Sequence, residues 1–545
     1  ATPRTPATTR TSARATTQVR HDTVGRPPQS STRSSIVMLV PLTRPVCPLG
    51  PPPPGTWQDD SVTSPTTPTP ASPSTTTAHH DLCVIGSGSG NTFLDERFEH
   101  LSVAMIERGA FGGTCLNRGC IPSKMLIYPA TVIRLAQEAR ALGVDLTLDG
   151  VRWREIRDRT FDRIDPIAAG GEDYRQGQDH LTVYNGEATF VGDRTVEVVD
   201  AHGATQQVSA DRMVLAAGAR PRIPQVAGLE TVPFHTSDTI MRIDEVPGHL
   251  VIIGGGFIAA EMSHVFGTFG AEVTVIGRSS RVLSHEDWEI GTRFTRALGR
   301  QIDLRVNVTV TSVEPTAAGV VAHCSDGSVV EGDTLLVAAG RVPNGDQLAV
   351  ERTGVRLDEY GYVVTDDTLA TDAPGVWALG DIRNPLQLKH LANREADIVG
   401  HNLSHPDDLH RIDESAVPHV VFSHPEVAQV GLSEESLQAL GRPYLVGRRD
   451  FGSTAYGWAM EDSVGFAKVL VDPETRLILG AHILGHEASL LIQPLAQAMA
   501  LGNTADEVAR TVIYPHPALT EVVEQLLLEV PHAPSTGGKF KPWEG

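Results

Sequence analysis

Residues 82–91 read LCVIGSGSGN, an apolar run that ends in a glycine-rich turn. Such a run followed by Gly86, Gly88 and Gly90 is typical of a buried parallel strand that turns tightly toward a helix. The turn lets the backbone approach a pyrophosphate, which then lies at the positive N-terminal end of the helix. Asn91 replaces the last glycine of G-x-G-x-x-G, so the motif is weak taken alone. We predict a βαβ unit that binds a dinucleotide.

The residues after this turn support the same prediction. We expect order to begin at Asp81, and a short helical stretch to lead to the strand SVAMIE, which ends at Glu107. A carboxylate at this distance from the turn binds a ribose hydroxyl in dinucleotide-binding folds. A tight turn and a surface Glu are the alternative, which the joint placement of the two features makes less favoured.

A second glycine-rich turn occurs in HLVIIGGGFIAAE, residues 249–261, and predicts a second dinucleotide site. The next strand ends in Gly277 and Arg278 instead of an acid, and Arg281 follows closely. Two guanidinium groups without a neighbouring carboxylate favour the 2′-phosphate of NADPH over NADH. Two solvated arginines are the alternative. The residues that fit the G-x-G-x-x-A form are Gly254, Gly256 and Ala259.

Two of the chain's five cysteines, Cys115 and Cys120, lie in GGTCLNRGCIPSK, residues 112–124. Two thiols with no second Cys or His pair at ligand spacing nearby make a poor zinc motif, so we predict no metal here and favour a disulfide. Pro122 suits the first turn of a helix, whose dipole favours a reactive thiolate. Two inert buried cysteines are the alternative. Lys124 falls on the same helical face as Cys120, either near a cofactor or in solvent.

Near the other end, IYPHPALTEVVEQ spans residues 513–525. His516 and Glu521 are five residues apart across a predicted helix start, and a carboxylate that orients an imidazole commonly holds a general acid or base. His-Pro also occurs at His405 and His424, so spacing alone does not single out His516.

Composition excludes several classes of function. The net charge is −21, which argues against nucleic acid as a partner, and no apolar run approaches the roughly 18 residues of a membrane span. The cysteines are few and odd in number, five in 545 residues, which fits a reducing cytoplasm. Residues 1–79 are rich in Thr, Pro, Ser and Arg and predict disorder; an organelle transit peptide or a mis-assigned start are the alternatives.

As a set, these stretches resemble the pyridine nucleotide-disulfide oxidoreductases over about residues 80–530. The shared motifs also include AAGARP, AAGRVPN, ALGD, FSHPEVAQVGLSE and HPALTE. The resemblance implies an α/β fold with two Rossmann-like domains, for FAD and NADPH, and a C-terminal α+β dimerisation domain. The expected parts are a disordered extension (1–79), the FAD-binding domain (80–235 and 346–415), the NADPH-binding domain (236–345) and the dimerisation domain (416–545).

The resemblance also implies roles for individual residues. Cys120 would face the flavin, Cys115 would attack the disulfide substrate, and His516, held by Glu521, would act as acid and base from the partner subunit of a homodimer. Glu261 would pair with Lys124. The expected FAD residues are Gly86, Gly88, Gly90, Glu107, Gly113, Thr114, Lys124, Ala188, Gly218 and Asp381. The expected NADPH residues are Gly254, Gly256, Glu261, Arg278, Arg281 and Gly340.

Within the family, GSGSGNTFLDERF and PLQLKHLANREA resemble members that reduce mycothione. We therefore expect an NADPH-dependent reductase of a low-molecular-weight disulfide. A dihydrolipoamide dehydrogenase is the alternative enzyme, although an acid in place of Gly277 would have suited it better. A flavin-binding interaction protein without turnover is the alternative from another class, which would need neither the cysteine pair nor His516 and Glu521.

Overall fold

The structure is a computed structural model that describes residues 77–532. The predictions made for residues 1–76 and for the last thirteen residues lie outside the described part of the chain. Strand β1 begins at Ala78, so the expected start of order at Asp81 is three residues too late. The reason is pairing that local composition does not reveal, because Ala78 and His79 pair with Val208 and Ser209 of β6, about 130 residues later.

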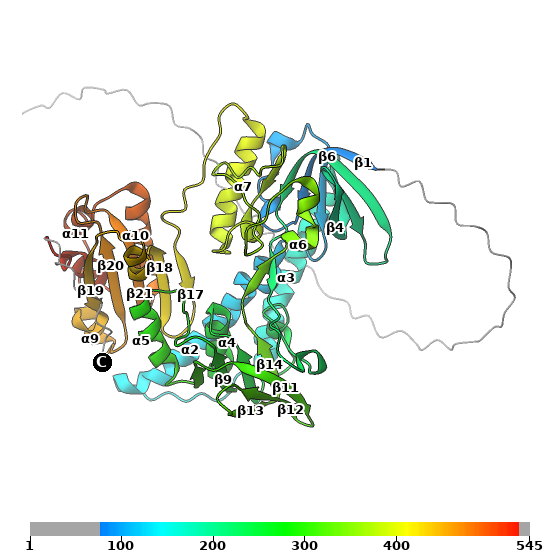
Figure 1. The fold of residues 1–545 in the computed structure, drawn as a ribbon. Helices are drawn as coiled ribbons and strands as arrows, with labels where there is room; N and C mark the ends of the chain where they lie inside the picture. The colour runs from blue at the N-terminus through cyan, green and yellow to red at the C-terminus, as the bar shows by residue number, and fades with distance from the viewer. Residues whose placement is uncertain (1–76, 533–545) are drawn as a thin grey trace, which may run out of the picture. The chain divides into compact units, whose positions relative to one another are not determined.

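The first sheet has seven strands in the order β3-β2-β1-β6-β5-β4, with β16 beside β6. Strands β1, β2, β3, β6 and β16 run parallel, whereas β4 and β5 form an antiparallel extension. In Figure 1, β1, β6 and β4 lie together, close to α7. The strands are β1 (Ala78–Ile85), β2 (Val103–Glu107), β3 (Leu181–Asn185), β4 (Glu187–Gly192), β5 (Thr195–Val199), β6 (Thr205–Leu215) and β16 (Val376–Ala378).

The expected short helix after the first glycine turn is not an α-helix. The chain forms only two three-residue 3-10 turns, η1 (Ser89–Asn91) and η2 (Glu96–Phe98). A guanidinium explains the difference, because Arg175 donates to the carbonyl oxygens of Asn91 (2.8 Å) and Leu94 (3.1 Å). These acceptors are therefore engaged by a side chain of another helix, and the positive end of a regular helix is missing at this turn.

The second sheet is parallel, in the order β10-β9-β8-β14. As predicted, a glycine turn leads from β8 into a helix, α4 (Phe257–Thr268), which is buried along most of its length. Strands β7 and β15 join this region to the first one as an antiparallel pair. The strands are β7 (Ala219–Pro221), β8 (His249–Ile253), β9 (Glu272–Gly277), β10 (Asp303–Val306), β14 (Thr334–Val337) and β15 (Arg341–Pro343), and β11 (Val310–Thr316), β12 (Gly319–Cys324) and β13 (Val329–Gly332) form a separate antiparallel sheet.

Two long helices connect the first sheet to the second. They are α2 (Cys120–Glu138) and α3 (Trp153–Gln176), and apolar side chains of both pack in one core with α4. Trp153 anchors the start of α3, since its ring lies against Phe266 and its Nε1 donates to the Ile243 carbonyl at 2.9 Å. The remaining helices before residue 416 are α1 (Gly113–Arg118), α5 (Trp288–Leu298), α6 (Gly345–Leu348) and α7 (Lys389–Ser404).

The C-terminal region is a five-stranded antiparallel sheet in the order β17-β18-β21-β20-β19, with α10 and α11 beside it in Figure 1. Strands β20 and β21 are buried along their whole length. In residues 77–532, no helix is both long and apolar enough for a membrane crossing. The elements are β17 (His419–Val421), β18 (Glu426–Gly431), α8 (Glu434–Ala439), β19 (Leu445–Asp450), α9 (Ala455–Ala459), β20 (Phe466–Val471), β21 (Ile478–Gly485), α10 (Ala488–Leu501), α11 (Ala505–Thr511) and α12 (Glu521–Leu528).

Candidate active site

One cavity brings together most of the residues predicted to act on the first dinucleotide. It extends from Glu107, at the end of β2, to the two cysteines at α1 and α2, and to Glu261 on α4. The predicted residues that line it are Gly86, Gly88, Glu107, Gly113, Thr114, Cys115, Cys120, Lys124, Ala188, Gly218, Glu261 and Asp381. The other predicted residues, Gly90, Gly254, Gly256, Arg278, Arg281, Gly340, His516 and Glu521, do not line it.

The cysteines lie on two consecutive helices separated by one glycine. Cys115 is inside α1 and Cys120 begins α2. A Cβ on Gly119 would lie 2.9 Å from the Thr114 carbonyl oxygen and 3.3 Å from the Cys115 Cα, so this close approach requires glycine. Both cysteines are free thiols in the structure, so the expected disulfide is not formed here. The described pair is the dithiol that reduction of such a bond would give.

The two thiols differ in acidity. A hydrogen bond from Cys115 lowers the pKa of Cys120 to about 7 against the opposing effect of desolvation, and the charge of Lys124 lowers it further. The same hydrogen bond, together with burial, raises the pKa of Cys115. Above about pH 7 the pair is therefore mainly a thiolate on Cys120 that accepts a hydrogen bond from the thiol of Cys115.

Lys124 lies on α2 and connects this helix to the second nucleotide-binding region. Its Nζ lies 2.7 Å from Glu261 Oε1 on α4, which confirms the expected pair, and 4.5 Å from the centre of the Phe422 ring. Burial raises the pKa of Glu261, while the Lys124 charge opposes that rise. The pair therefore places a charged hydrogen bond at the meeting point of α2 and α4.

The first glycine turn is packed against the start of α1. A Cβ on Gly113 would lie 2.8 Å from the Cα of Gly88, and Gly113 has a φ of +64°. At the other end of the turn, Glu107 accepts hydrogen bonds from the backbone N–H and hydroxyl of Ser87, each at 2.8 Å. Gly90 is buried beneath the turn, where a Cβ would meet Ala216 at 2.6 Å. The backbone of this turn therefore lines the cavity, and it is held in place by Gly113 on one side and Glu107 on the other.

The second glycine turn has similar close packing. A Cβ on Gly254 would lie 2.1 Å from the Ala338 carbonyl oxygen, whereas nothing lies within 4 Å of a Cβ on Gly256 or Gly340. Gly256 immediately precedes α4, so the open side of the turn is at a helix N-terminus. This arrangement suits a phosphate group.

The two arginines predicted near this turn are placed differently. Arg278 is exposed at the end of β9. Arg281 is half-buried and donates to the carbonyl oxygen of Ser284 at 3.1 Å, while its Nη2 lies 3.5 Å from Glu435 Oε1. Arg278 is therefore the more available of the two for an anionic ligand.

His516 and Glu521 form the predicted pair. His516 Nδ1 lies 2.7 Å from Glu521 Oε1, and Glu521 also accepts from the Ala518 N–H at 3.2 Å. The hydrogen bond with His516 lowers the pKa of Glu521. The imidazole is 71% exposed, and it projects from the C-terminal region without lining the cysteine cavity of its own chain.

Comparisons with known proteins agree with this architecture. A family model described as pyridine nucleotide-disulphide oxidoreductase matches residues 80–396, and the dimerisation domain of the same family matches residues 417–527. The chain belongs to the pyridine nucleotide-disulfide oxidoreductases. It therefore combines two nucleotide-binding regions with a dimerisation domain, as the sequence predicted.

The match to individual relatives covers nearly the whole length of each relative. The chain is 45% identical to mycothione reductase of Mycobacterium tuberculosis over 82% of this chain and 99% of the relative. It is 33% identical to dihydrolipoyl dehydrogenase of Chlamydia muridarum over 84% and 98%. Among solved structures, the flavoprotein disulfide reductase RclA of Escherichia coli superposes with a TM-score of 0.72 at 26% identity, covering 82% of this chain and 99% of that one.

The cavity of this oxidoreductase suits FAD, the cofactor expected for the family. Its glycine turn leaves no room for side chains at Gly86, where a Cβ would lie 2.3 Å from the Ala216 carbonyl oxygen. Asp381 supplies a partly buried carboxyl group on the lining, and desolvation there raises the pKa of that group. The cysteines line the same cavity, so a bound flavin would have the redox pair within it.

Sequence reasoning missed Lys389, the first residue of α7. Its Nζ lies 2.8 Å from Ser89 Oγ, next to the first glycine turn, and the residue lines the cavity. Burial lowers the pKa of Lys389, while Cys115, Cys120 and Asp381 oppose that effect. Its position 300 residues after Ser89 gave no local signal. The Lys389 ammonium group therefore lies at the first glycine turn, which is followed by 3-10 turns instead of a regular α-helix.

Asn91 has a structural explanation that the motif did not provide. Arg175 Nε donates to Asn91 Oδ1 at 2.6 Å, in addition to the carbonyl contacts described above. A glycine at position 91 could not accept this bond. The departure from G-x-G-x-x-G is therefore coupled to a buried arginine on α3.

Proposed function

We propose that this protein uses NADPH to reduce a low-molecular-weight disulfide, and that the substrate is mycothione. The observation that carries the proposal is the thiol pair of Cys115 on α1 and Cys120 at the start of α2, within a cavity that also holds the first glycine turn and the Lys124–Glu261 pair. The 45% identity to a mycothione reductase along almost its full length supports the choice of substrate. The dihydrolipoyl dehydrogenase relative is more distant, at 33%.

FAD would pass electrons from the nicotinamide to the cysteine pair. Gly86, Gly88, Gly113 and Thr114 would hold it through the backbone on one side, with Asp381 and Lys389 on the other. NADPH would lie at the second turn, over Gly254, Gly256 and Gly340, with Arg278 near its 2′-phosphate. Arg281 would contribute less, because its guanidinium is already engaged by Ser284 and Glu435.

The reduced cysteine pair then reduces the substrate in two exchanges. Cys115 loses its proton and attacks one substrate sulfur, which forms a mixed disulfide and releases the other sulfur as a thiolate. The Cys120 thiolate next attacks the sulfur of Cys115, which restores the Cys115–Cys120 disulfide and releases the second substrate sulfur as a thiolate that takes a proton from water. The high pKa of Cys115 means that this residue needs a base, while Cys120 is ready as a thiolate.

His516 is the base and acid that this scheme requires. It would take the proton of Cys115 and return it to the departing thiolate, and Glu521 would hold the ring through Nδ1 so that Nε2 does the transfer. Because this imidazole is exposed and absent from the cavity of its own chain, it would act in the site of a second subunit. Ile513 is 95% exposed only three residues away, as expected of a surface that a partner covers.

The proposed division of the chain follows from the same scheme. Residues 80–235 and 346–415 would bind FAD, residues 236–345 would bind NADPH, and residues 416–545 would form the dimer. The pairing of β16 with β6 supports a first domain made of two separate segments. The cytoplasm is the proposed location, since the scheme needs NADPH and a free dithiol.

The test of the substrate is the rate of NADPH and NADH oxidation with mycothione, glutathione disulfide and lipoamide at matched concentrations. Rapid NADPH oxidation with mycothione alone is the expected result. Turnover with lipoamide species and NAD⁺ or NADH would instead assign a dihydrolipoamide dehydrogenase. No turnover with any disulfide, in protein that binds FAD, would support the non-catalytic binder.

The shared active site has its own test, a mixed dimer of Cys115→Ser and His516→Gln subunits. If His516 acts on the partner, one of the two sites keeps both an intact cysteine pair and an intact imidazole, so the mixed dimer regains about half of the wild-type activity per dimer while each parental homodimer stays inactive. An inactive mixed dimer would mean that His516 serves the site of its own chain.

A further inference from the structure

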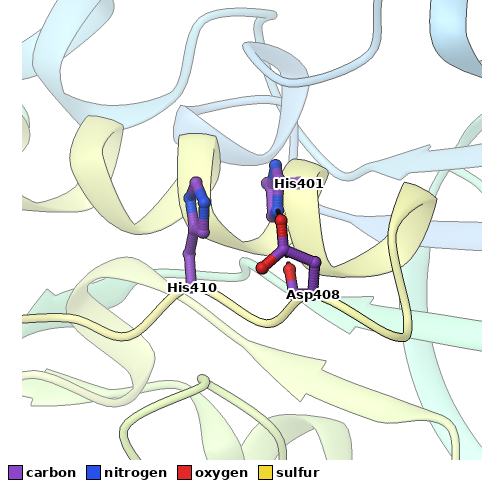
Figure 2. A group of neighbouring side chains, drawn as sticks. All are labelled: His401, Asp408 and His410. Atoms are coloured by element: carbon purple, nitrogen blue, oxygen red, sulfur yellow. Dashed lines mark hydrogen bonds and ion pairs between the residues drawn. The ribbon is translucent and has the colours of Figure 1, made fainter.

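A second cluster of potential ligands lies at the far end of α7, away from the cysteine cavity. His401 is in the last turn of this helix, and Asp408 and His410 are on the loop that follows. One ligand atom from each of the three side chains lies within 4.8 Å of the other two. Figure 2 shows the His401 and His410 rings alongside α7, with the Asp408 carboxylate next to His401.

The loop that carries two of these ligands is held in place by a buried amide. Asn402 is 3% exposed; its Nδ2 donates to the His410 carbonyl oxygen at 3.0 Å, and its Oδ1 accepts from the His410 N–H at 2.7 Å. The same Nδ2 also donates to the Thr368 carbonyl oxygen at 3.0 Å. The backbone of His410 is therefore fixed against α7 before any ligand binds, which lowers the ordering cost of assembling the site.

The two imidazoles of this cluster lie face to face, so binding one ion through their in-plane lone pairs requires one ring to turn about its side-chain bonds. The rings of His401 and His410 are stacked, with centres 3.5 Å apart and planes 10° apart, and the His405 ring stacks on His401 at 4.5 Å. His401 Nε2 lies 2.8 Å from the Asp408 carbonyl oxygen, which can only accept, so Nε2 carries the hydrogen and the lone pair is on Nδ1. A ring N–H that donates to a backbone carbonyl is the usual support of a metal-binding histidine.

We propose that His401, Asp408 and His410 form a binding site for a divalent transition-metal ion such as Zn²⁺. Two imidazole nitrogens and one carboxylate oxygen suit zinc, nickel or copper, whereas calcium and magnesium require oxygen ligands. The Asp408 side chain is 81% exposed, so the fourth position is open to water or to the neighbouring His405. The bound ion joins the end of α7 to the loop after it.

The experiment is a calorimetric titration of the untagged, FAD-bound enzyme with Zn²⁺, after chelator treatment and oxidation of the cysteine pair so that its thiols do not bind the ion. The wild-type protein binds one ion per chain at this site. His401→Asn and His410→Asn each weaken that binding at least about tenfold, because each removes a ligand. The matched control is His202→Asn, an exposed histidine outside the cluster, which leaves the binding unchanged. Mg²⁺ does not compete.

Two results overturn the site: no zinc binding by the wild type, or equal binding by the wild type and the His401→Asn, His410→Asn double variant. A second measurement guards against a variant that disturbs the loop. The electron paramagnetic resonance spectrum of Cu²⁺ bound to the wild type shows coupling to imidazole nitrogens, and His410→Asn removes one of them. A spectrum from oxygen ligands alone contradicts the proposal.

Discussion

Lys389 Nζ lies 2.8 Å from Ser89 Oγ and so places a cation at the first glycine turn. The two residues come from α7 and from the short turn η1. A regular helix after such a turn would supply positive charge through its dipole, but here only 3-10 turns follow. Lys389 takes over part of that electrostatic role.

We therefore expect Lys389→Met to weaken FAD binding at least about tenfold, since a hydrogen bond to a charged group contributes about 1.5–3 kcal/mol. The measurement is the dissociation constant of FAD, from the fluorescence of flavin released on dilution. The matched control is Arg394→Met, which removes an exposed charge from the same helix. Equal affinity in the Lys389→Met and wild-type proteins would contradict the assignment.

The thiolate on Cys120 gives a pH prediction. Its pKa of about 7 means that alkylation of this residue in the reduced enzyme rises with pH through a midpoint near 7 and levels off above it, because only the thiolate reacts. Cys115→Ala removes the hydrogen-bond donor, so the midpoint moves upward; Cys115→Ser keeps a donor and moves it less. Mass spectrometry of the peptide that contains Cys120 follows the reaction with iodoacetamide. A midpoint that is the same in all three proteins would show that Cys115 does not set this pKa.

The placement of Arg278 and Arg281 predicts unequal effects on cofactor choice. Arg278→Leu should raise the KM for NADPH at least about tenfold and leave the KM for NADH unchanged, because a charge-assisted hydrogen bond to the 2′-phosphate is lost. Arg281→Gln should have a smaller effect, since that side chain already contacts Ser284 and Glu435. Steady-state kinetics with both nucleotides distinguish the two cases. A larger effect of Arg281→Gln would reverse the assignment.

Lys468 predicts a large effect on stability. It is 1% exposed, and its Nζ lies 2.9 Å from Asp287 Oδ2 and 2.5 Å from Glu434 Oε2. Lys468→Met leaves these carboxylates buried without their cation, so the free energy of unfolding should fall by about 3–5 kcal/mol. Urea unfolding followed by circular dichroism measures the loss.

The double variant Lys468→Met, Asp287→Asn is the control for this buried charge. It should recover part of the lost stability, because one of the uncompensated charges is gone. If the double variant is as unstable as the sum of the two single variants, the charges do not interact as the distances indicate.

Much of the site could be predicted because its signals are local. Cys115 and Cys120 are five positions apart, as are His516 and Glu521, and the glycines of both turns follow apolar strands directly. Neighbours along a helix or turn meet whenever that element forms, so spacing is enough to place them. The Lys124–Glu261 pair is different, because the two residues are far apart in sequence and only the family resemblance brought them together.

Other features depended on contacts that spacing does not encode. The expected short helix after the first glycine turn is replaced by 3-10 turns, because Arg175, 84 residues after Asn91, donates a hydrogen bond to the Asn91 carbonyl oxygen. Nothing in the sequence distinguished Arg278 from Arg281 as a ligand for the 2′-phosphate. In the structure, Glu435 of the C-terminal region forms an ion pair with Arg281.

The sequence by itself thus determined the strands, the glycine turns, the cysteine pair and the family, since these follow from local periodicity and spacing. Only the tertiary structure decided where Lys389 lies, which arginine is available and how His401 meets His410. Those relationships arise when helices and strands distant in the chain pack together, and burial then decides which charged groups find partners.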